Sequence, residues 1–121
     1  MNELGIDAET RVPLIDGVPL TERIDTFELR ARMKPAGDAY GGLTSGSNLL
    51  RPGRGVAVLG CSCGDVGCWP LLADITVDGD TIVWNEFRQP YREDRDYTRF
   101  GPFRFDRAQY EAALEKLSEL G

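Results

Sequence analysis

A run of three candidate β-strands, residues 56–87, constrains the fold more than any other part of the chain. Two tight turns join the strands, and the second contains Asp78-Gly79, a strong signal for a β-hairpin. A two-residue turn would put Trp84 on the face of Ile75, whereas a three-residue turn would put Phe87 there, and both registers stay open. In either register the stretch predicts an antiparallel β-meander.

All three cysteines of the chain lie at the first turn of this meander, at Cys61, Cys63 and Cys68. If residues 64–67 form a four-residue loop, Cys63 and Cys68 face each other across the strand pair, and Cys61 falls on the same side. In that register Leu59 shares its face with Leu72. The three thiols then converge on one side of the sheet.

Three interpretations of this cysteine cluster compete. Free cysteine is among the most buried residue types, so the thiols can simply pack in the core. A zinc site needs four ligands, and because the chain has no histidine, Asp65, Asp74 or a second chain would have to complete it. A Cys63–Cys68 disulfide would suit the cross-strand geometry, although the Cys-x-x-Cys spacing of redox enzymes is absent. The pattern therefore allows zinc as a cofactor but assigns none.

Length and charge restrict the classes of function. A chain of 121 residues is long enough for one core, so we predict a single domain over residues 1–121, with residues 1–10 frayed. A net charge of −6 repels phosphate backbones, which predicts no nucleic-acid partner. The longest apolar run falls well short of the roughly 18 residues of a membrane span, so we expect no membrane association. An odd number of clustered cysteines and a polar N-terminus predict a cytoplasmic protein.

The flanking segments predict further elements. Residues 11–20 are typical of an edge strand, because Pro13 and Pro19 are poorly tolerated in a central one. Residues 20–34 fit both a helical stripe and a strand alternation, and their residue types favour a short helix that begins near Thr21. The glycine-rich residues 35–55 predict a loop. We expect apolar side chains to pin this loop to the core, at Tyr40, Leu43, Leu49 and Leu50.

Residues 106–120 give the clearest helical pattern. Asp106 is expected to cap the helix, with Gln109 completing a capping box. One apolar face follows the helical repeat, at Tyr110, Ala113, Leu114 and Leu117. We therefore predict an α+β fold, in which an antiparallel β-meander sheet of four to five strands is packed by this C-terminal amphipathic helix, with a second short helix near 20–30.

A second irregular segment, residues 88–105, interleaves arginines with aromatic residues. This composition is typical of protein interfaces and of surfaces that stack on bases, and the negative net charge disfavours bases. The candidate protein-binding residues are Arg88, Tyr91, Arg92, Arg95, Tyr97, Arg99 and Phe100. A structural alternative stays open, in which the aromatic rings anchor the segment over the sheet and the arginines pair with neighbouring acids.

The absence of histidine excludes Ser-His-Asp and Cys-His catalysis within one chain. Two carboxylates, Asp74 and Glu86, lie near apolar strand ends where burial could raise a pKa. Their spacing does not distinguish them from surface charges, so we predict no catalytic residue and favour a protein that is not an enzyme.

Three stretches resemble a family of small bacterial proteins, frequent in actinobacteria, to which no activity is assigned. They are GCSCGDVGCWPLLADI (60–75), TIVWNEFRQPYR (81–92) and FGPFRFDRAQYEAAL (100–114). The family shares a Gly-Cys-x-Cys-Gly-x-x-Gly-Cys-Trp-Pro turn and a Phe-Asp-Arg-x-Gln-Tyr helix start. The resemblance covers residues 55–115 well and the N-terminal third loosely. It implies a cytoplasmic bacterial setting, and it implies no reaction and no catalytic residues.

These observations predict a non-enzymatic protein-binding or regulatory module, whose partner is another protein or a second copy of the chain. An acidic single domain of this size would also suit immunity to a toxin. The alternative function is a zinc or thiol-redox site at Cys61, Cys63 and Cys68.

Overall fold

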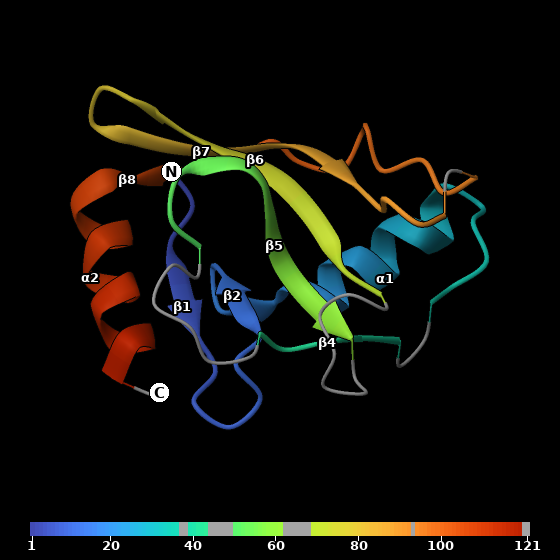
Figure 1. Ribbon diagram of the computed structural model, residues 1–121, viewed down its shortest axis with the longest axis horizontal. Helices are drawn as coiled ribbons and strands as arrows, with labels where there is room; N and C mark the ends of the chain where they lie inside the picture. Colours follow the sequence, from blue (N-terminus) through green and yellow to red (C-terminus); the bar gives the residue numbers. More distant parts are fainter. Residues whose placement is uncertain (37–38, 44–49, 62–68, 93, 120–121) are drawn as a thin grey trace.

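The predicted meander is present as strands β5 (Gly53–Cys61), β6 (Leu71–Asp78) and β7 (Thr81–Arg88). The computed structural model describes residues 1–36, 39–43, 50–61, 69–92 and 94–119, with residue 61 described by its backbone alone. Strands β4 (Tyr40–Gly41) and β8 (Phe103–Asp106) extend the meander at its two edges. The result is a curled five-stranded antiparallel sheet in the order β4-β5-β6-β7-β8 (Figure 1). The predicted α+β class is therefore confirmed.

The hairpin between β6 and β7 has the two-residue turn. Asp78 pairs with Thr81, and Ile75 pairs with Trp84, so these two large side chains share a face. The pairing then shifts at a β-bulge, where Glu86 adopts a φ of 54°. Because the bulge changes the side to which later residues point, Phe87 is buried as well as Trp84.

The predicted register of β5 against β6 is wrong. Ala57 pairs with Leu72, and Leu59 pairs with Leu71, so Leu59 lies opposite Leu71 and not Leu72. The register thus already differs by one residue at Leu59, and an irregularity between Ala57 and Leu59, which adds an extra residue to β5, shifts it by one more. Val58 and Leu59 are consequently both fully buried.

The first residues of the chain form a strand, so the prediction that residues 1–10 are frayed is wrong. Strands β1 (Leu4–Ile6), β2 (Pro13–Ile15) and β3 (Val18–Pro19) make a separate three-stranded antiparallel sheet. The prediction of an edge strand at residues 11–20 also needs correction, since β2 is the middle strand. Pro13 is tolerated there because it begins β2, where the pairing with β3 has not yet started.

Two helices complete the fold, as predicted. Helix α1 (Leu20–Arg30) follows β3 directly, and helix α2 (Arg107–Glu119) follows β8. Figure 1 shows the two helices at opposite ends of the molecule, with α2 beside β1 and β8. The Oδ2 atom of Asp106 accepts a hydrogen bond from the Gln109 N–H at 3.0 Å, which confirms Asp106 as the cap of α2. None of the helices in the described ranges is long and apolar enough to cross a membrane.

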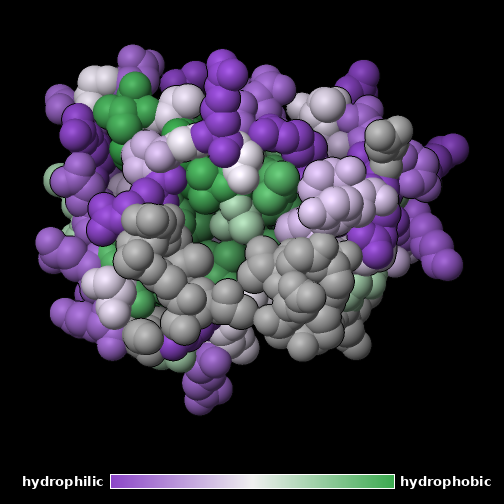
Figure 2. Space-filling view, viewed as in Figure 1, coloured by the Kyte–Doolittle hydropathy of each residue, from purple (hydrophilic) through white to green (hydrophobic). Residues whose placement is uncertain are grey.

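The core lies between the large sheet, the small sheet and the helices. Figure 2 shows one face of the molecule, with apolar side chains gathered at its centre and hydrophilic side chains around the margin. The predicted anchors of the glycine-rich segment are buried, at Tyr40, Leu43 and Leu50, whereas Leu49 lies outside the described residues. Gly42 allows this segment to approach the N-terminal hairpin, because a Cβ atom there would lie 1.7 Å from the carbonyl oxygen of Thr10.

Candidate functional site

The candidate site begins at the outer edge of β1. The backbone carbonyl of Glu3 and the N–H of Asp7 bond across to the β2 side, with N···O distances of 2.9 and 3.1 Å. Inward and outward backbone positions alternate along an antiparallel strand pair. The N–H and C=O groups of Leu4 and Ile6 therefore point away from β2.

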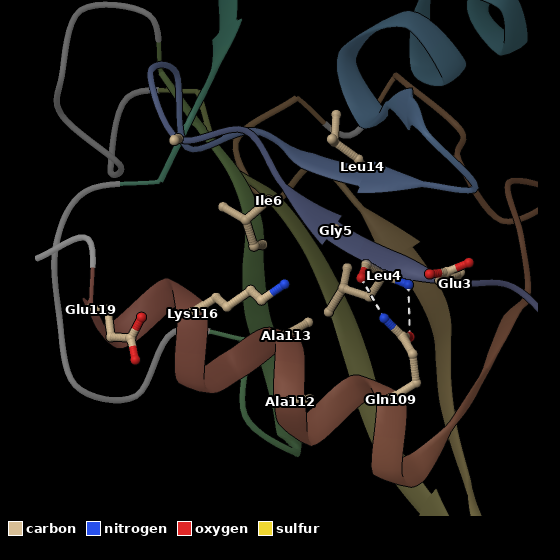
Figure 3. Close-up of a pocket in the computed structure, with 11 residues that line it drawn as sticks. Glu3, Leu4, Gly5, Ile6, Leu14, Gln109, Ala112, Ala113, Lys116 and Glu119 are labelled. Atoms are coloured by element: carbon tan, nitrogen blue, oxygen red, sulfur yellow. Dashed lines mark hydrogen bonds between the residues drawn. The ribbon is translucent and has the colours of Figure 1, made fainter.

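Each outward position along this edge has a different environment. The Asn2 N–H donates to the carbonyl of Arg104 at 2.7 Å. At Leu4, the N–H donates to the Oε1 atom of Gln109 at 2.9 Å, and the Nε2 atom of Gln109 donates to the Leu4 carbonyl at 2.6 Å (Figure 3). For the backbone of Ile6, the described part of the chain provides no hydrogen-bond partner. With respect to the described residues, the edge of β1 is thus open at Ile6.

The two hydrogen bonds of Gln109 correct the sequence analysis, which predicts that this side chain completes a capping box on its own helix. The amide instead reaches β1, where it takes the place of a neighbouring strand. An amide side chain can do this because it carries one acceptor and a donor in the same plane, like a peptide group.

The open edge faces a groove between β1 and α2, with a volume of about 730 Å³. Its walls are mostly apolar and include Leu4, Ile6, Leu14, Ala112 and Ala113. The small side chains of the two alanines leave space on the helix side of the groove. Figure 3 shows Lys116 extending from α2 into the space between the helix and β1. Lys116 has no ion-pair partner among the residues that the structure describes.

This arrangement is suited to binding a peptide backbone. An extended segment can accept a hydrogen bond from the Ile6 N–H and donate one to the Ile6 carbonyl, while its side chains contact the apolar walls. The polar side chains that line the groove are Glu3, Gln109, Lys116 and Glu119, and all except Gln109 are exposed. The groove therefore offers shape and hydrogen bonds rather than a buried acid or base.

Two of the predicted binding residues, Arg95 and Tyr97, lie inside the molecule. Both bind the carboxylate of Glu28, which is 1% exposed. Arg95 Nη2 donates to Glu28 Oε2 at 2.6 Å, and the Tyr97 hydroxyl donates to the same oxygen at 2.7 Å. The Tyr97 oxygen also accepts from Arg95 Nε and from the Tyr40 hydroxyl, each at 2.9 Å. These side chains hold their segment against α1, which supports the structural alternative for them.

The surroundings of this cluster set the protonation states of Tyr97 and Arg95. Desolvation, followed by the hydrogen bond with Tyr40, raises the pKa of the Tyr97 hydroxyl above its ordinary value. Desolvation acts to lower the pKa of Arg95, but the hydrogen bonds with Tyr97 and Glu28 outweigh it and raise that pKa. The tyrosine therefore stays neutral and the guanidinium stays charged near neutral pH.

The burial of Glu28 is not predicted from the sequence. The strand-like alternation of residues 20–34 groups it with exposed polar side chains. On a helix, however, Glu28 follows Leu20 and Ile24 at four-residue spacing and so shares their buried face. That spacing is the signal that could have identified a buried carboxylate in need of a cationic partner.

The other predicted binding residues are dispersed. Arg88 pairs with Asp74 at 3.0 Å, Arg92 lies with its guanidinium carbon 3.4 Å from the centroid of the Trp69 ring, and Tyr91 is 66% exposed. Phe100 is buried and Arg99 is exposed, and both line a separate cleft beside α1. The structure does not bring these residues together as one surface, and a partner for them stays a prediction.

The predicted cysteine cluster lies almost entirely outside the described residues. Cys63 and Cys68 are not among them, and Cys61 is described only as the last residue of β5. No group of three or more metal-binding side chains is found within the described ranges. The zinc, disulfide and packing interpretations all stay predictions.

The two candidate carboxylates are surface groups. The Asp74 carboxylate accepts hydrogen bonds from the Gly55 N–H at 2.9 Å and from Arg88 at 3.0 Å. The Gly55 bond, and after it Arg88, lower the pKa of Asp74 below its ordinary value, so the predicted rise is wrong there. Glu86 is exposed at the bulge of β7.

Comparisons with protein-family models, with curated proteins and with solved structures find no match to this chain.

Proposed function

We propose that this protein is a non-enzymatic protein-binding or regulatory module, which takes an extended segment of a partner protein in the groove between β1 and α2. One observation carries the proposal: the N–H and C=O groups of Ile6 have no partner among the described residues and face an apolar groove. Addition of a strand to such an edge is a common mode of peptide recognition, in which backbone hydrogen bonds give affinity and side-chain pockets give specificity.

The dimensions and charge of the groove support this proposal. Its volume of about 730 Å³ lies within the usual range of ligand pockets, about 300–1,000 Å³. The ammonium group of Lys116 favours a segment that places a carboxylate near the C-terminal half of α2. Since β1 presents a single open position, we expect a short segment that pairs at Ile6 and depends on its apolar side chains for most of its affinity.

The proposal is tested with peptides selected from a random library displayed on phage. An enriched peptide is titrated into isotope-labelled protein while the backbone amides are followed by NMR. We expect the Ile6 amide to shift and its hydrogen exchange to slow, because the peptide covers this N–H. Ala112→Arg fills the groove from α2 and should weaken binding by at least about tenfold, equivalent to about 1.4 kcal/mol.

The matched control is Ala108→Arg, which adds the same side chain at an exposed position of α2 outside the groove. It should leave the affinity unchanged. Peptides that bind without affecting the Ile6 amide, or that bind Ala112→Arg as well as the wild type, would overturn the proposal. A concentration-dependent dimer abolished by Ala112→Arg would identify a second copy of the chain as the occupant.

A further inference from the structure

A second cleft lies between α1 and the segment that leads into β8, at the end of the molecule away from α2 (Figure 1). Its volume is about 390 Å³. Three phenylalanines and three arginines contribute to its lining: Phe27, Phe100 and Phe103, with Arg23, Arg30 and Arg99. Glu22 is the single acidic residue among the lining side chains.

The phenylalanines form a packed floor. The Phe100 ring meets Phe27 and Phe103 edge-on, with centroids 5.3 Å apart in each case. Gly101, which also lines the cleft, has a φ of 79°, and its lack of a side chain lets the segment approach the Phe87 ring, because a Cβ atom there would lie 2.7 Å from that ring. The floor is therefore held in place by the core and does not need a ligand to form.

The three arginines line the cleft beside this floor, and their guanidinium groups have N–H donors that can bind a ligand. Arg23 is fixed by two hydrogen bonds to the Ile15 carbonyl, at 2.9 and 3.3 Å. Arg30 and Arg99 make no ion pair with any described residue. Arg99 interacts electrostatically with Asp96, whose pKa is lowered first by Thr98 and only lastly by Arg99. Two guanidinium groups are thus available to a ligand.

The cleft continues along the helix. A neighbouring cleft of about 600 Å³ shares Phe27, Arg30 and Arg99 and extends past Arg32 and Met33. Its lining also includes two acidic residues, Asp94 and Asp96. Arg30 and Arg99 consequently border both spaces, and a chain-like ligand can cross from one to the other beneath them.

We propose that this cleft binds an acidic segment of a partner protein that carries an aromatic or large aliphatic side chain. Guanidinium groups pair with carboxylates through two parallel hydrogen bonds, and the phenylalanine floor buries the apolar side chain. Arg23 has an ion-pair partner in Asp16, at 3.9 Å, so the charge of the site comes from Arg30 and Arg99. In a protein with a net charge of −6, these two arginines beside one glutamate form a local site for an anion. This site is separate from the β1–α2 groove and does not depend on it.

Nucleic acid fits these observations less well. Bases stack on open ring faces, whereas the floor rings stand edge-on to one another, and Arg23 lies 5.8 Å from the centroid of Phe103 over its face. The overall negative charge also repels a long phosphate backbone.

The test uses a fluorescein-labelled peptide, Asp-Glu-Phe-Glu-Asp, and measures binding to the full chain by fluorescence anisotropy. Arg30→Gln and Arg99→Gln should each weaken binding about tenfold. Arg104→Gln is the matched control, since it removes the same charge from an exposed arginine of β8 that does not line the cleft. A peptide with Ala in place of Phe should bind at least about fivefold more weakly. Circular dichroism verifies that each variant is folded.

Binding lost equally in Arg104→Gln would mean general charge attraction and would overturn the proposal, as would equal affinity for the Ala peptide or no measurable binding. A short oligothymidylate that displaces the peptide and loses affinity in Arg30→Gln would assign the cleft to nucleic acid instead. Because Ala112→Arg leaves this cleft intact, failure here is distinguishable from failure of the groove.

Discussion

Glu28 is a carboxylate buried on the inner face of α1, and its charge is balanced by Arg95 alone among the described cations. Removing one partner of a buried ion pair leaves the other charge without compensation, which typically costs about 3–5 kcal/mol. We expect Glu28→Ala to lower the free energy of unfolding by about 3 kcal/mol, measured by urea denaturation.

A double-mutant cycle separates this ion pair from the packing around it. If the pair is coupled, Glu28→Ala with Arg95→Ala should destabilise the protein by less than the sum of the two single variants. Strict additivity would contradict the assignment. The uncharged pair Glu28→Met with Arg95→Met tests a further point, since an apolar replacement of similar volume can restore much of the stability.

Asp74 gives the fold a pH dependence. Its folded pKa lies below the ordinary value of 3.8, first because the Gly55 N–H bonds to it and also because of Arg88. A carboxyl whose pKa falls on folding stabilises the protein above its unfolded pKa, and that contribution is lost as the pH drops through the folded pKa. The wild type should therefore be more stable than Asp74→Asn at neutral pH, and the difference should shrink from about pH 4 toward about pH 2.

Asp78→Asn is the matched control for this measurement. Asp78 is exposed on the same strand, and its side chain has no hydrogen bond or ion pair with another described residue. A constant difference between wild type and Asp74→Asn across this pH range would show that Asp74 contributes nothing through its charge.

At the scale of elements, the hydrogen bonds between β1 and α2 in the described part of the chain all come from one side chain, that of Gln109. Gln109→Ala removes both hydrogen bonds to Leu4 and leaves that backbone exposed to water, which we expect to cost about 1–3 kcal/mol. The Leu4 amide should exchange its hydrogen faster than in the wild type, as measured by NMR. Gln109→Glu keeps the acceptor but loses the donor, so it should restore protection of the Leu4 N–H only in part.

Glu115→Ala provides the comparison for Gln109→Ala, because Glu115 is exposed on the same helix. Unchanged exchange at Leu4 in Gln109→Ala would mean that packing alone retains β1.

Local patterns predicted the elements better than they predicted the pairing. Asp78-Gly79 and the alternation beside it identify the hairpin, and the apolar repeat of residues 110–117 identifies α2. The predicted register of β5 fails because it depends on an assumed four-residue loop at residues 64–67, and because the irregularity near Val58 leaves no mark on an apolar run. Strand β1 is missed because its three residues are too short to show alternation.

Local sequence patterns cannot predict the candidate site either, because its residues lie far apart in the chain. Its groove joins residues 3–14 to residues 109–119, and no periodicity connects them. The sequence singles out Gln109, but it predicts a capping box there, which requires no contact with β1. The composition of residues 88–105 indicates Arg95 and Tyr97 as binding residues. Composition cannot show that both side chains point inward and bind a carboxylate on α1.

At the scale of the whole molecule, the presence of a zinc cofactor depends on whether the three cysteines bind the metal. The chain has no histidine, and Asp74, one candidate for a fourth zinc ligand, is already engaged by Gly55 and Arg88. We therefore expect native mass spectrometry of protein purified under reducing conditions to give the mass of the bare chain with three free thiols.

A chelator-sensitive excess of one zinc ion would contradict this expectation and would make Cys61, Cys63 and Cys68 ligands. Substitution of all three by Ser then identifies their role. Loss of the metal together with the fold would indicate a structural site, and loss of a thiol-dependent response with the fold intact would indicate redox chemistry.

The hydrogen bonds between Gln109 and Leu4 join residues 105 positions apart in the chain. A ribosome makes β1 first and α2 last among these elements, so the nascent β1 must wait for its partner. Until residue 109 has left the exit tunnel, the apolar side chains of the N-terminal hairpin lack their cover and are open to chaperones and proteases. The domain therefore reaches its native state only after α2 has emerged, and a message truncated before α2 would yield a product whose N-terminal hairpin stays uncovered.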